Sequence, residues 1–306
     1  MHGTDKKELF ERIIRIRPKL SPKKRRVADF MMEDYKRLFL MSAKEIAQKC
    51  RVSEPTITRL VMDLGFGGYG EFEHYLKGLL RIELTSVERL IKAAKETDNV
   101  STLEAYRQNS VANLENMMQS VSELEFRNLA RMIHSAGLVL IAGYKASATL
   151  AYYFGYLLKK IKEGVIIDTT YASENLDFIS LHGESLLVFV IAFPRYPQRT
   201  LELVEYTRKY HSKIVCVSDS LKSPVVNLSD HYVIVDMEGF SFVDPFSHIV
   251  TLLGALIHEI AYIDKDATAR RLSQLEDGAR KRHDFYTTKQ DEAEIYDPLK
   301  MDHINH

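Results

Sequence analysis

The chain has 306 residues, of which 45% are hydrophobic, and it contains 42 Lys plus Arg and 42 Asp plus Glu. This length is enough for two domains with separate cores, and no apolar run approaches the roughly 18 residues that a membrane span requires. Residues 1–18 contain no apolar stretch typical of a secretory signal. Cys50 and Cys216 lie in apolar periodic segments, as expected of buried free thiols in a reducing compartment. We therefore expect a cytoplasmic protein without a membrane partner.

The zero net charge conceals an asymmetry. Residues 1–84 contain 18 Lys and Arg against 12 Asp and Glu, an excess of 6 positive charges, which leaves 24 against 30 for the rest of the chain. A basic N-terminal part joined to an acidic body suits a phosphate-binding module attached to a domain of another kind. The basic residues are densest between positions 19 and 26, a segment that is either a solvated helix start or a DNA-binding patch.

Short helices are expected at Leu9 to Ile16 and Val27 to Met32, followed by two helical periodicities that meet across a four-residue turn between positions 41 and 66. Ser42 and Ser53 occupy N-cap positions, and Gly65 occupies a stop position. Each helix carries apolar residues at i, i+3, i+4 and i+7, namely Ala43, Ile46, Ala47 and Cys50 in the first and Ile57, Leu60, Val61 and Leu64 in the second. This pattern predicts a helix-turn-helix, although helical hairpins that bind no DNA share the geometry.

The second helix of this unit leaves a polar face outward near its N-terminus, which is the end that a recognition helix presents to base edges. We expect Thr56, Thr58 and Arg59 to contact bases and Lys44 to contact backbone phosphate. The complete set of predicted DNA-binding residues is Lys44, Ser53, Glu54, Thr56, Thr58 and Arg59.

The middle of the chain is helical. The glycine-rich segment from Gly65 to Phe72 lies between helical patterns and not after a strand, so it predicts a turn and not a dinucleotide-binding loop. The next helical pattern runs from Glu71 to about Ala94, and residues 98–101 interrupt it as a linker. Two further helices are expected at residues 102–121 and 123–135.

From residue 138 the pattern changes to short, continuous apolar runs that alternate with helices. Continuous runs are typical of parallel strands buried on both faces. Strands are predicted at residues 138–142, 165–168, 186–192, 214–218 and 232–235, and helices at 146–160, 172–181, 198–210 and 244–262. The prediction is an all-α helix-turn-helix domain followed by a doubly wound, flavodoxin-like α/β domain with five parallel strands in the order 2-1-3-4-5. A peripheral helix to about residue 285 and a loose polar tail should follow.

Two segments resemble a known family. LSPKKRRVADFMM and MSAKEIAQKCRVSEPTITRLVMDLGFGGYGEF are similar to the N-terminal domain of the RpiR family of bacterial transcriptional regulators, and the α/β half is similar to their sugar-isomerase (SIS) domain, over roughly Lys6 to Ile263. The resemblance implies a helical DNA-binding domain that binds a double-stranded operator, a homodimer or homotetramer, and a SIS domain that senses a metabolite, commonly a phosphorylated sugar. Such regulators usually carry glycine at the position of Arg51 and a basic residue at that of Gly67.

The resemblance divides the chain into four parts. These are a DNA-binding domain at residues 1–84, connecting helices at 85–122, the SIS domain at 123–264, and a C-terminal helix with its tail at 265–306.

The effector loops depart from the usual pattern of the SIS domain. Residues 143–147 stand where a Gly-x-Gly-Ser-Ser loop is usual, and residues 192–197 replace a Ser-x-Ser-Gly-x-Thr loop whose hydroxyls hold the sugar phosphate. Both loops should flank the point between the first and third strands where the winding reverses and ligands bind. Because cations replace hydroxyls there, we expect a small anionic metabolite, a phosphosugar or a sugar acid. The predicted effector-binding residues are Gly143, Lys145, Ser147, Arg195, Arg199 and Thr200; Lys145 and Arg199 are alternatively part of a solvated helix start.

The alternative is a SIS-type sugar-phosphate isomerase, which needs a general base in the pocket. Glu174 and Asp219 are possible bases, and His182 and His248 are possible acids, but spacing identifies no partner for any of them. The helix-turn-helix favours a regulator, so we predict no catalytic residues, no metal site and no cofactor. An operator with two-fold symmetry requires a dimer, and the apolar helix at 244–262 either forms its interface or covers the sheet.

Overall fold

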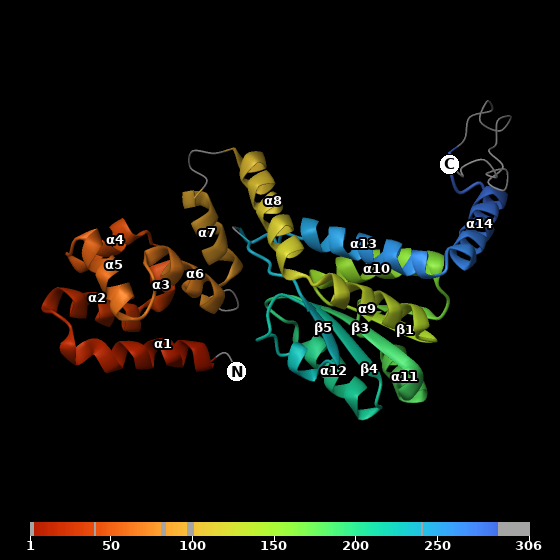
Figure 1. The fold of residues 1–306 in the computed structure, drawn as a ribbon, viewed down its shortest axis with the longest axis horizontal. Helices are drawn as coiled ribbons and strands as arrows, with labels where there is room; N and C mark the ends of the chain where they lie inside the picture. Colours follow the sequence, from red (N-terminus) through yellow and green to blue (C-terminus); the bar gives the residue numbers. More distant parts are fainter. Residues whose placement is uncertain (1–2, 40, 81–83, 97–100, 240, 287–306) are drawn as a thin grey trace.

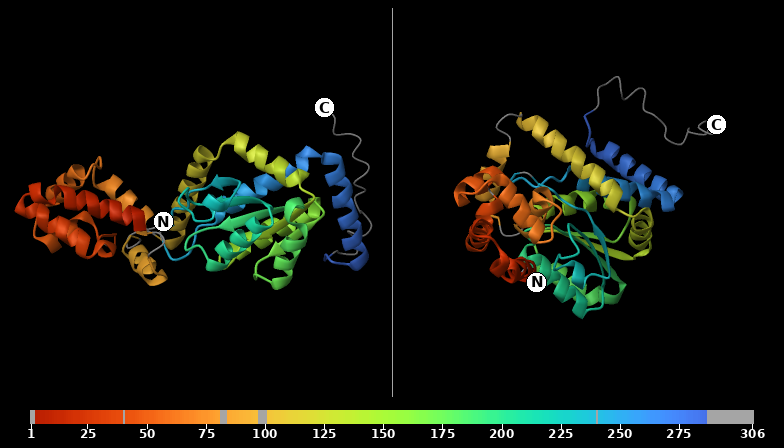
Figure 2. Two further views of the ribbon diagram at one scale, coloured as in Figure 1. Left: turned by 90° about the horizontal axis from the view of Figure 1, so that it is seen from below. Right: turned by 60° about the vertical axis from the view of Figure 1, so that its left-hand side comes forward.

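The computed structural model describes residues 3–39, 41–80, 84–96, 101–239 and 241–286. A helical N-terminal domain and an α/β domain form the two ends of an elongated molecule, and helices α7 (Ser86–Glu96) and α8 (Thr102–Ser120) lie between them (Figure 1). The left view of Figure 2 shows the same arrangement from below. Among the described residues, no helix combines the length and apolar character that a membrane span needs.

Short amphipathic helices pack around one core in the N-terminal domain. They are α1 (Gly3–Ile16), a 3-10 turn (Arg17–Lys19), α2 (Pro22–Glu33), α3 (Tyr35–Phe39), α4 (Ala43–Cys50), α5 (Glu54–Asp63) and α6 (Tyr69–Leu80). Their fully buried side chains include Leu9, Ile13, Met31, Ile46, Ile57, Leu60, Phe72 and Leu76. The two predicted helices of the helix-turn-helix correspond to α4 and α5, and α3 was not predicted.

The start of α4 is closed by a complete capping box. The Ser42 side chain accepts from the backbone N–H of Glu45 at 3.2 Å, while the Glu45 carboxylate accepts from the N–H of Ser42 at 2.6 Å. Ser53 occupies the N-cap of α5 as expected, but its hydroxyl makes no capping bond and instead lies 3.0 Å from the hydroxyl of Thr56. Both helices therefore begin where the sequence predicts, but only α4 has a side-chain hydrogen bond that caps its first turn.

Both helices of this unit end in a left-handed residue. Gly65, after α5, has φ +94°, which glycine adopts without strain. Arg51, after α4, has φ 52° and ψ 51°, in the left-handed region that a side chain with a Cβ disfavours. This geometry gives a physical reason for the glycine that is usual at the position of Arg51.

The connecting helices differ from the prediction. The helix expected from Glu71 to about Ala94 is wrong as a single element, because a new N-terminus forms at Thr85. Thr85 and Glu88 make reciprocal capping bonds, 3.2 Å to the N–H of Glu88 and 2.7 Å to the Glu88 carboxylate, and α7 starts there. The linker predicted at residues 98–101 lies outside the described residues except for Ser101, which caps α8.

The α/β domain contains a five-stranded parallel sheet in the order β2-β1-β3-β4-β5, as predicted. The strands are β1 (Leu138–Ala142), β2 (Val165–Asp168), β3 (Leu186–Ala192), β4 (Lys213–Ser218) and β5 (His231–Ile234). The helices are α9 (Glu123–Ser135), α10 (Ser147–Ile161), α11 (Ser173–His182), α12 (Gln198–Lys209), α13 (Ser247–Ile263) and α14 (Lys265–Arg282). All seven residues of β3 are buried, because it is the central strand and helices cover both of its faces.

Successive strand residues enter two separate cores. Val139, Ile141 and Phe189 pack under α9, α10 and α13, while Leu140 and Val188 pack toward α11 and α12 (Figure 1). Because the buried side chains of α13 enter the first of these cores, its apolar character is explained by covering the sheet. The peripheral helix predicted after Asp264 is α14, and the polar tail from residue 287 lies outside the described residues.

Candidate functional site

The N-terminal half of α5 carries three of the predicted DNA-binding residues side by side. Glu54, Thr58 and Arg59 line one shallow hollow together with Pro55. Arg59 is exposed, while Ile57, Leu60 and Val61 of α5 are buried in the core. The hollow therefore presents a guanidinium, a hydroxyl and a carboxylate on the face directed away from the protein.

The remaining predicted DNA-binding residues flank this face. Ser53 and Thr56 form the hydroxyl pair at the start of α5, and Lys44 is exposed in the first turn of α4. A lysine there suits a backbone phosphate, since phosphate contacts position a helix that other side chains use to read bases. The structure thus places all six on or beside the start of the helix-turn-helix helices.

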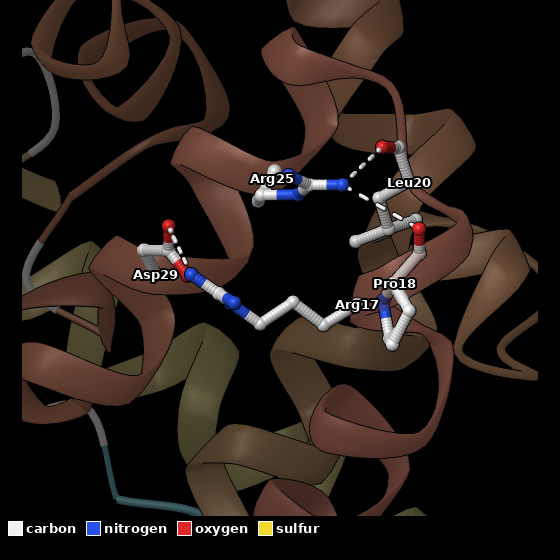
Figure 3. A network of polar contacts seen from close by, with 5 residues as sticks. All are labelled: Arg17, Pro18, Leu20, Arg25 and Asp29. Atoms are coloured by element: carbon white, nitrogen blue, oxygen red, sulfur yellow. Dashed lines mark hydrogen bonds and ion pairs between the residues drawn. The ribbon is translucent and has the colours of Figure 1, made fainter.

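The basic cluster of residues 19–26 is partly structural. Arg25 donates from Nη2 to the carbonyls of Pro18 and Leu20, both at 3.4 Å, and Arg17, which precedes the cluster, donates to Asp29 at 2.6 and 3.2 Å (Figure 3). Two further members tie α2 to the helix-turn-helix. Lys24 pairs with Asp63 of α5, and Arg26 donates to the carbonyl of Arg51 at 3.2 Å. Lys19 and Lys23 are exposed.

The second candidate site lies at the carboxyl edge of the sheet, where the order reverses between β1 and β3. Lys145 is exposed in the loop after β1 and has a left-handed φ of 57°. Arg195 is exposed in the loop after β3 and donates to the Ser86 hydroxyl at 3.5 Å. Arg199 begins α12, pairs with Glu202 at 3.0 Å, and stacks its guanidinium 4.9 Å from the ring centre of Tyr171. Lys145 and Arg195 therefore lie on the two loops that flank the predicted ligand position, and Arg199 lies in the first turn of α12.

The two predicted hydroxyls are buried. Ser147 is 4% exposed at the first position of α10, and Thr200 is 0% exposed in the first turn of α12, where its Oγ1 has no hydrogen-bond partner among the described residues. In this structure the Thr200 side chain is therefore not accessible to a ligand. Gly143 is required by its surroundings, because a Cβ there would lie 2.6 Å from the backbone oxygen of Ser147.

Sequence reasoning missed two tyrosine–carboxylate pairs beneath these loops. The Tyr144 hydroxyl donates to Asp168 at 2.6 Å, and that carboxylate also accepts from the N–H of Tyr171 at 2.8 Å. The Tyr196 hydroxyl donates to Asp219 at 2.6 Å. Burial, helped by the bond to Asp168, raises the pKa of Tyr144 far above its ordinary value. The pairs hold the loops after β1 to β4 in place, and no short motif signals them because their partners are 24 and 23 positions apart.

The residues considered for an isomerase are occupied or scattered. Asp219 is bound by Tyr196, and the Nε2 of buried His248 lies 3.1 Å from the carbonyl of Asp236. Glu174 is exposed in the first turn of α11, and the ring of His182 packs 4.4 Å from Phe178 at its end. Among the described residues, no group of three or more His, Cys, Asp and Glu side chains is arranged to hold a metal ion.

Comparison with known proteins assigns both halves. Residues 7–82 match the helix-turn-helix domain of the rpiR family, and residues 132–259 match the SIS domain. A curated relative, the bifunctional protein glk of Paraburkholderia xenovorans, is 35% identical over 71 residues, which cover 23% of this chain. The match spans only 11% of that relative.

Two solved structures share the fold. The NanR protein of Vibrio vulnificus, complexed with ManNAc-6P, covers 89% of this chain and 98% of its own at 18% identity, with a TM-score of 0.53. The sugar isomerase domain of an RpiR transcription factor from Sphaerobacter thermophilus covers 57% of this chain and 98% of its own at 17% identity, with a TM-score of 0.55. With an rpiR-type helix-turn-helix domain followed by a SIS domain, the chain belongs to the RpiR family of transcriptional regulators.

Proposed function

We propose that the protein is a DNA-binding transcriptional regulator that reads its operator through α5 and changes its DNA affinity when a small anionic carbohydrate metabolite binds at the β1/β3 switch point. One observation carries the proposal. The same chain joins a helix-turn-helix with an outward polar face to a parallel sheet whose ligand edge displays Lys145, Arg195 and Arg199. Such a regulator acts in the cytoplasm, where its operator is.

The chemistry of the switch point supports an anion. Proline at positions 194 and 197 offers no backbone N–H, so the loop after β3 has fewer neutral donors for a phosphate. Arg195 supplies a planar fork that binds phosphate or carboxylate through two bonds, and Lys145 adds a point charge from the facing loop. Arg199 is held by Glu202 and Tyr171, so we assign it a supporting role. The ManNAc-6P bound to the similar NanR structure belongs to this class of ligand.

We infer that the regulator works as a homo-oligomer, because a two-fold operator is read by two recognition helices about one DNA turn apart. Exposed aromatic side chains on α10 and at the end of α13 support a contact between subunits at this surface. Tyr152 is 61%, Tyr156 54% and Tyr262 63% exposed. Light scattering tests this inference, and a monomer at concentrations that saturate the operator would overturn it.

A thermal-shift screen tests the effector class. The panel contains phosphorylated sugars, including N-acetylmannosamine 6-phosphate, together with sugar acids and neutral polyols. The wild type should be stabilised by a phosphorylated sugar or a sugar acid, and Arg195→Ala should lose most of that shift. Glu174→Gln, a surface change on α11, serves as the control and should retain it. Stabilisation by a neutral polyol that Arg195→Ala preserves would reject the anion model.

The same ligands test the enzymatic alternative. The proposed regulator should not interconvert aldose and ketose phosphates, because Asp219 is engaged by Tyr196 and the Nε2 of His248 lies against a backbone carbonyl. Turnover of a stabilising phosphosugar that survives Arg59→Ala but not Asp219→Asn would establish an isomerase instead.

A further inference from the structure

The connecting helix α7 is attached to the α/β domain by a half-buried ion pair. The guanidinium Nη1 of Arg89 lies 3.1 Å from the carboxylate of Asp244, and the two side chains are only 20% and 17% exposed. Asp244 lies in the loop between β5 and α13, 155 positions further along the chain. Partial burial shields such a pair from the screening that weakens pairs on the surface.

The second connecting helix binds the same loop. Asn109 and Asn113 of α8 both donate to the carbonyl of Glu238, at 2.7 and 2.9 Å, and the Asn113 side chain accepts from the N–H of Glu238 at 2.8 Å. Asn113 is almost completely buried. These three bonds anchor α8 on the α/β domain.

The first turn of α7 contacts the candidate effector site through a hydrogen bond, and the chain just before it enters the core of the helical domain. Arg195, from the loop after β3, donates to Ser86 at 3.5 Å, which is long for such a bond and therefore weak. Ser86 directly follows the Thr85 cap of the helix. Two residues before it, Leu84 is buried in the core of the helical domain. Only two residues of chain therefore separate Ser86 from the core of the helical domain.

We propose that α7 carries the effector signal, with Arg195 exchanging its contact to Ser86 for the effector anion while the Arg89–Asp244 pair keeps α7 attached as a pivot. The inference rests on the proposed function, since it assumes an anion at Arg195. A charge-assisted, two-bond contact to an anion is stronger than one long bond to a neutral hydroxyl, so binding favours release of Ser86. Release frees the N-terminal end of α7 one turn before the pivot and lets the helical domain change its position.

Hydrogen exchange of the amides in residues 86–94 tests the proposal on the full-length protein, with inorganic phosphate and the phosphorylated sugars of the panel as probes. Chloride at equal ionic strength is the reference. Phosphate should speed exchange in α7 of the wild type about tenfold, as expected for a helix that loses one anchor. Ser86→Ala should show the faster exchange without any ligand and little further change when phosphate is added.

Two further variants make the experiment specific. Arg89→Gln should also speed exchange in α7, because it removes the pivot. Arg107→Gln is the matched control, since among the described residues this arginine pairs within α8, with Glu104, and exchange in α7 should not change.

The outcomes separate this inference from the proposed function. If the ligands raise the melting temperature through Arg195 but leave exchange in α7 unaltered, the inference is wrong and the effector site stands. The inference is also wrong if Ser86→Ala leaves α7 as protected as in the wild type. If neither phosphate nor any phosphorylated sugar or sugar acid of the panel stabilises the protein, the anion site itself fails, and the inference fails with it.

Discussion

Replacement of Arg51 by glycine should stabilise the protein. Arg51 ends α4 with φ 52° and ψ 51°, a conformation that costs a residue with a Cβ about 1–2 kcal/mol. Glycine removes that cost but loses about 0.5–1 kcal/mol more backbone entropy on folding. The bond from Arg26 reaches the backbone carbonyl of Arg51, so it persists in the variant. The expected net gain is about 0.5–1 kcal/mol, or a rise in melting temperature of about 2–6 °C.

Thermal unfolding followed by far-UV circular dichroism measures this gain. Gly65→Ala is the opposite test, because φ at Gly65 is +94° and an alanine there is strained although no neighbouring atom obstructs its Cβ. That variant should lose about 1 kcal/mol or more. Gly70→Ala, in the first turn of α6 with open space around the Cβ and no positive φ, controls for the loss of a glycine as such. A lower melting temperature for Arg51→Gly would refute the strain argument.

Arg51→Gly should also weaken DNA binding. A strained residue that persists at a binding surface is often retained for its side chain, and the Arg51 side chain is exposed in the turn beside α5. If Arg51 contacts a phosphate, Arg51→Gly should lower the slope of log affinity against log salt by about one. Fluorescence anisotropy with a duplex of arbitrary sequence measures this slope, and an unchanged slope would exclude the contact.

Three further predictions concern single side chains. Arg59→Ala should cost about 1–3 kcal/mol on the preferred duplex and relax specificity at one position, which anisotropy with single-base variants of that duplex measures; an unchanged affinity at fixed salt would refute the proposed docking. Burial and nearby carboxylates raise the pKa of Tyr69 to about 12, so its neutral form contributes stability that is fully present below about pH 10, the unfolded value, and is lost as the pH rises to 12. Tyr69→Phe should therefore make stability fall less steeply between these pH values in urea titrations, and an unchanged slope would contradict the shift. Tyr144→Phe should lower the free energy of unfolding by about 1.5–3 kcal/mol, because it removes a buried bond to the Asp168 carboxylate, and denaturant titration that shows no loss would mean that the loop does not depend on this bond.

Local patterns were sufficient for the strands. The continuous apolar runs predicted all five within one residue at each end, because burial on both faces leaves a local signature, and the doubly wound fold class then supplied the strand order. The break between α6 and α7 was missed, although Thr85 and Glu88 form the Ser/Thr-x-x-Glu signature of a helix start. The apolar residues keep their helical spacing from one helix to the next, so periodicity alone predicted a single helix there.

Long-range contacts could not be predicted. The pair between Arg89 and Asp244 and the bonds from Asn109 to the loop after β5 join positions more than 100 residues apart, and no spacing rule relates them. The same limit applies to the effector residues. The sequence placed Thr200 in the correct turn, but its complete burial depends on how α12 packs against the sheet.

The most direct test of the proposed function measures how ligand binding to the α/β domain changes the affinity of the helical domain for DNA. A preferred duplex is first selected from random sequences with the full-length protein, and its dissociation constant is then measured with and without the best ligand of the thermal-shift panel. The proposed function predicts a change of about 5-fold or more in affinity, within the usual range of allosteric coupling, and the loss of this change in Arg195→Ala. A ligand that stabilises the protein at saturation but leaves the affinity for the selected duplex unchanged would contradict the central claim.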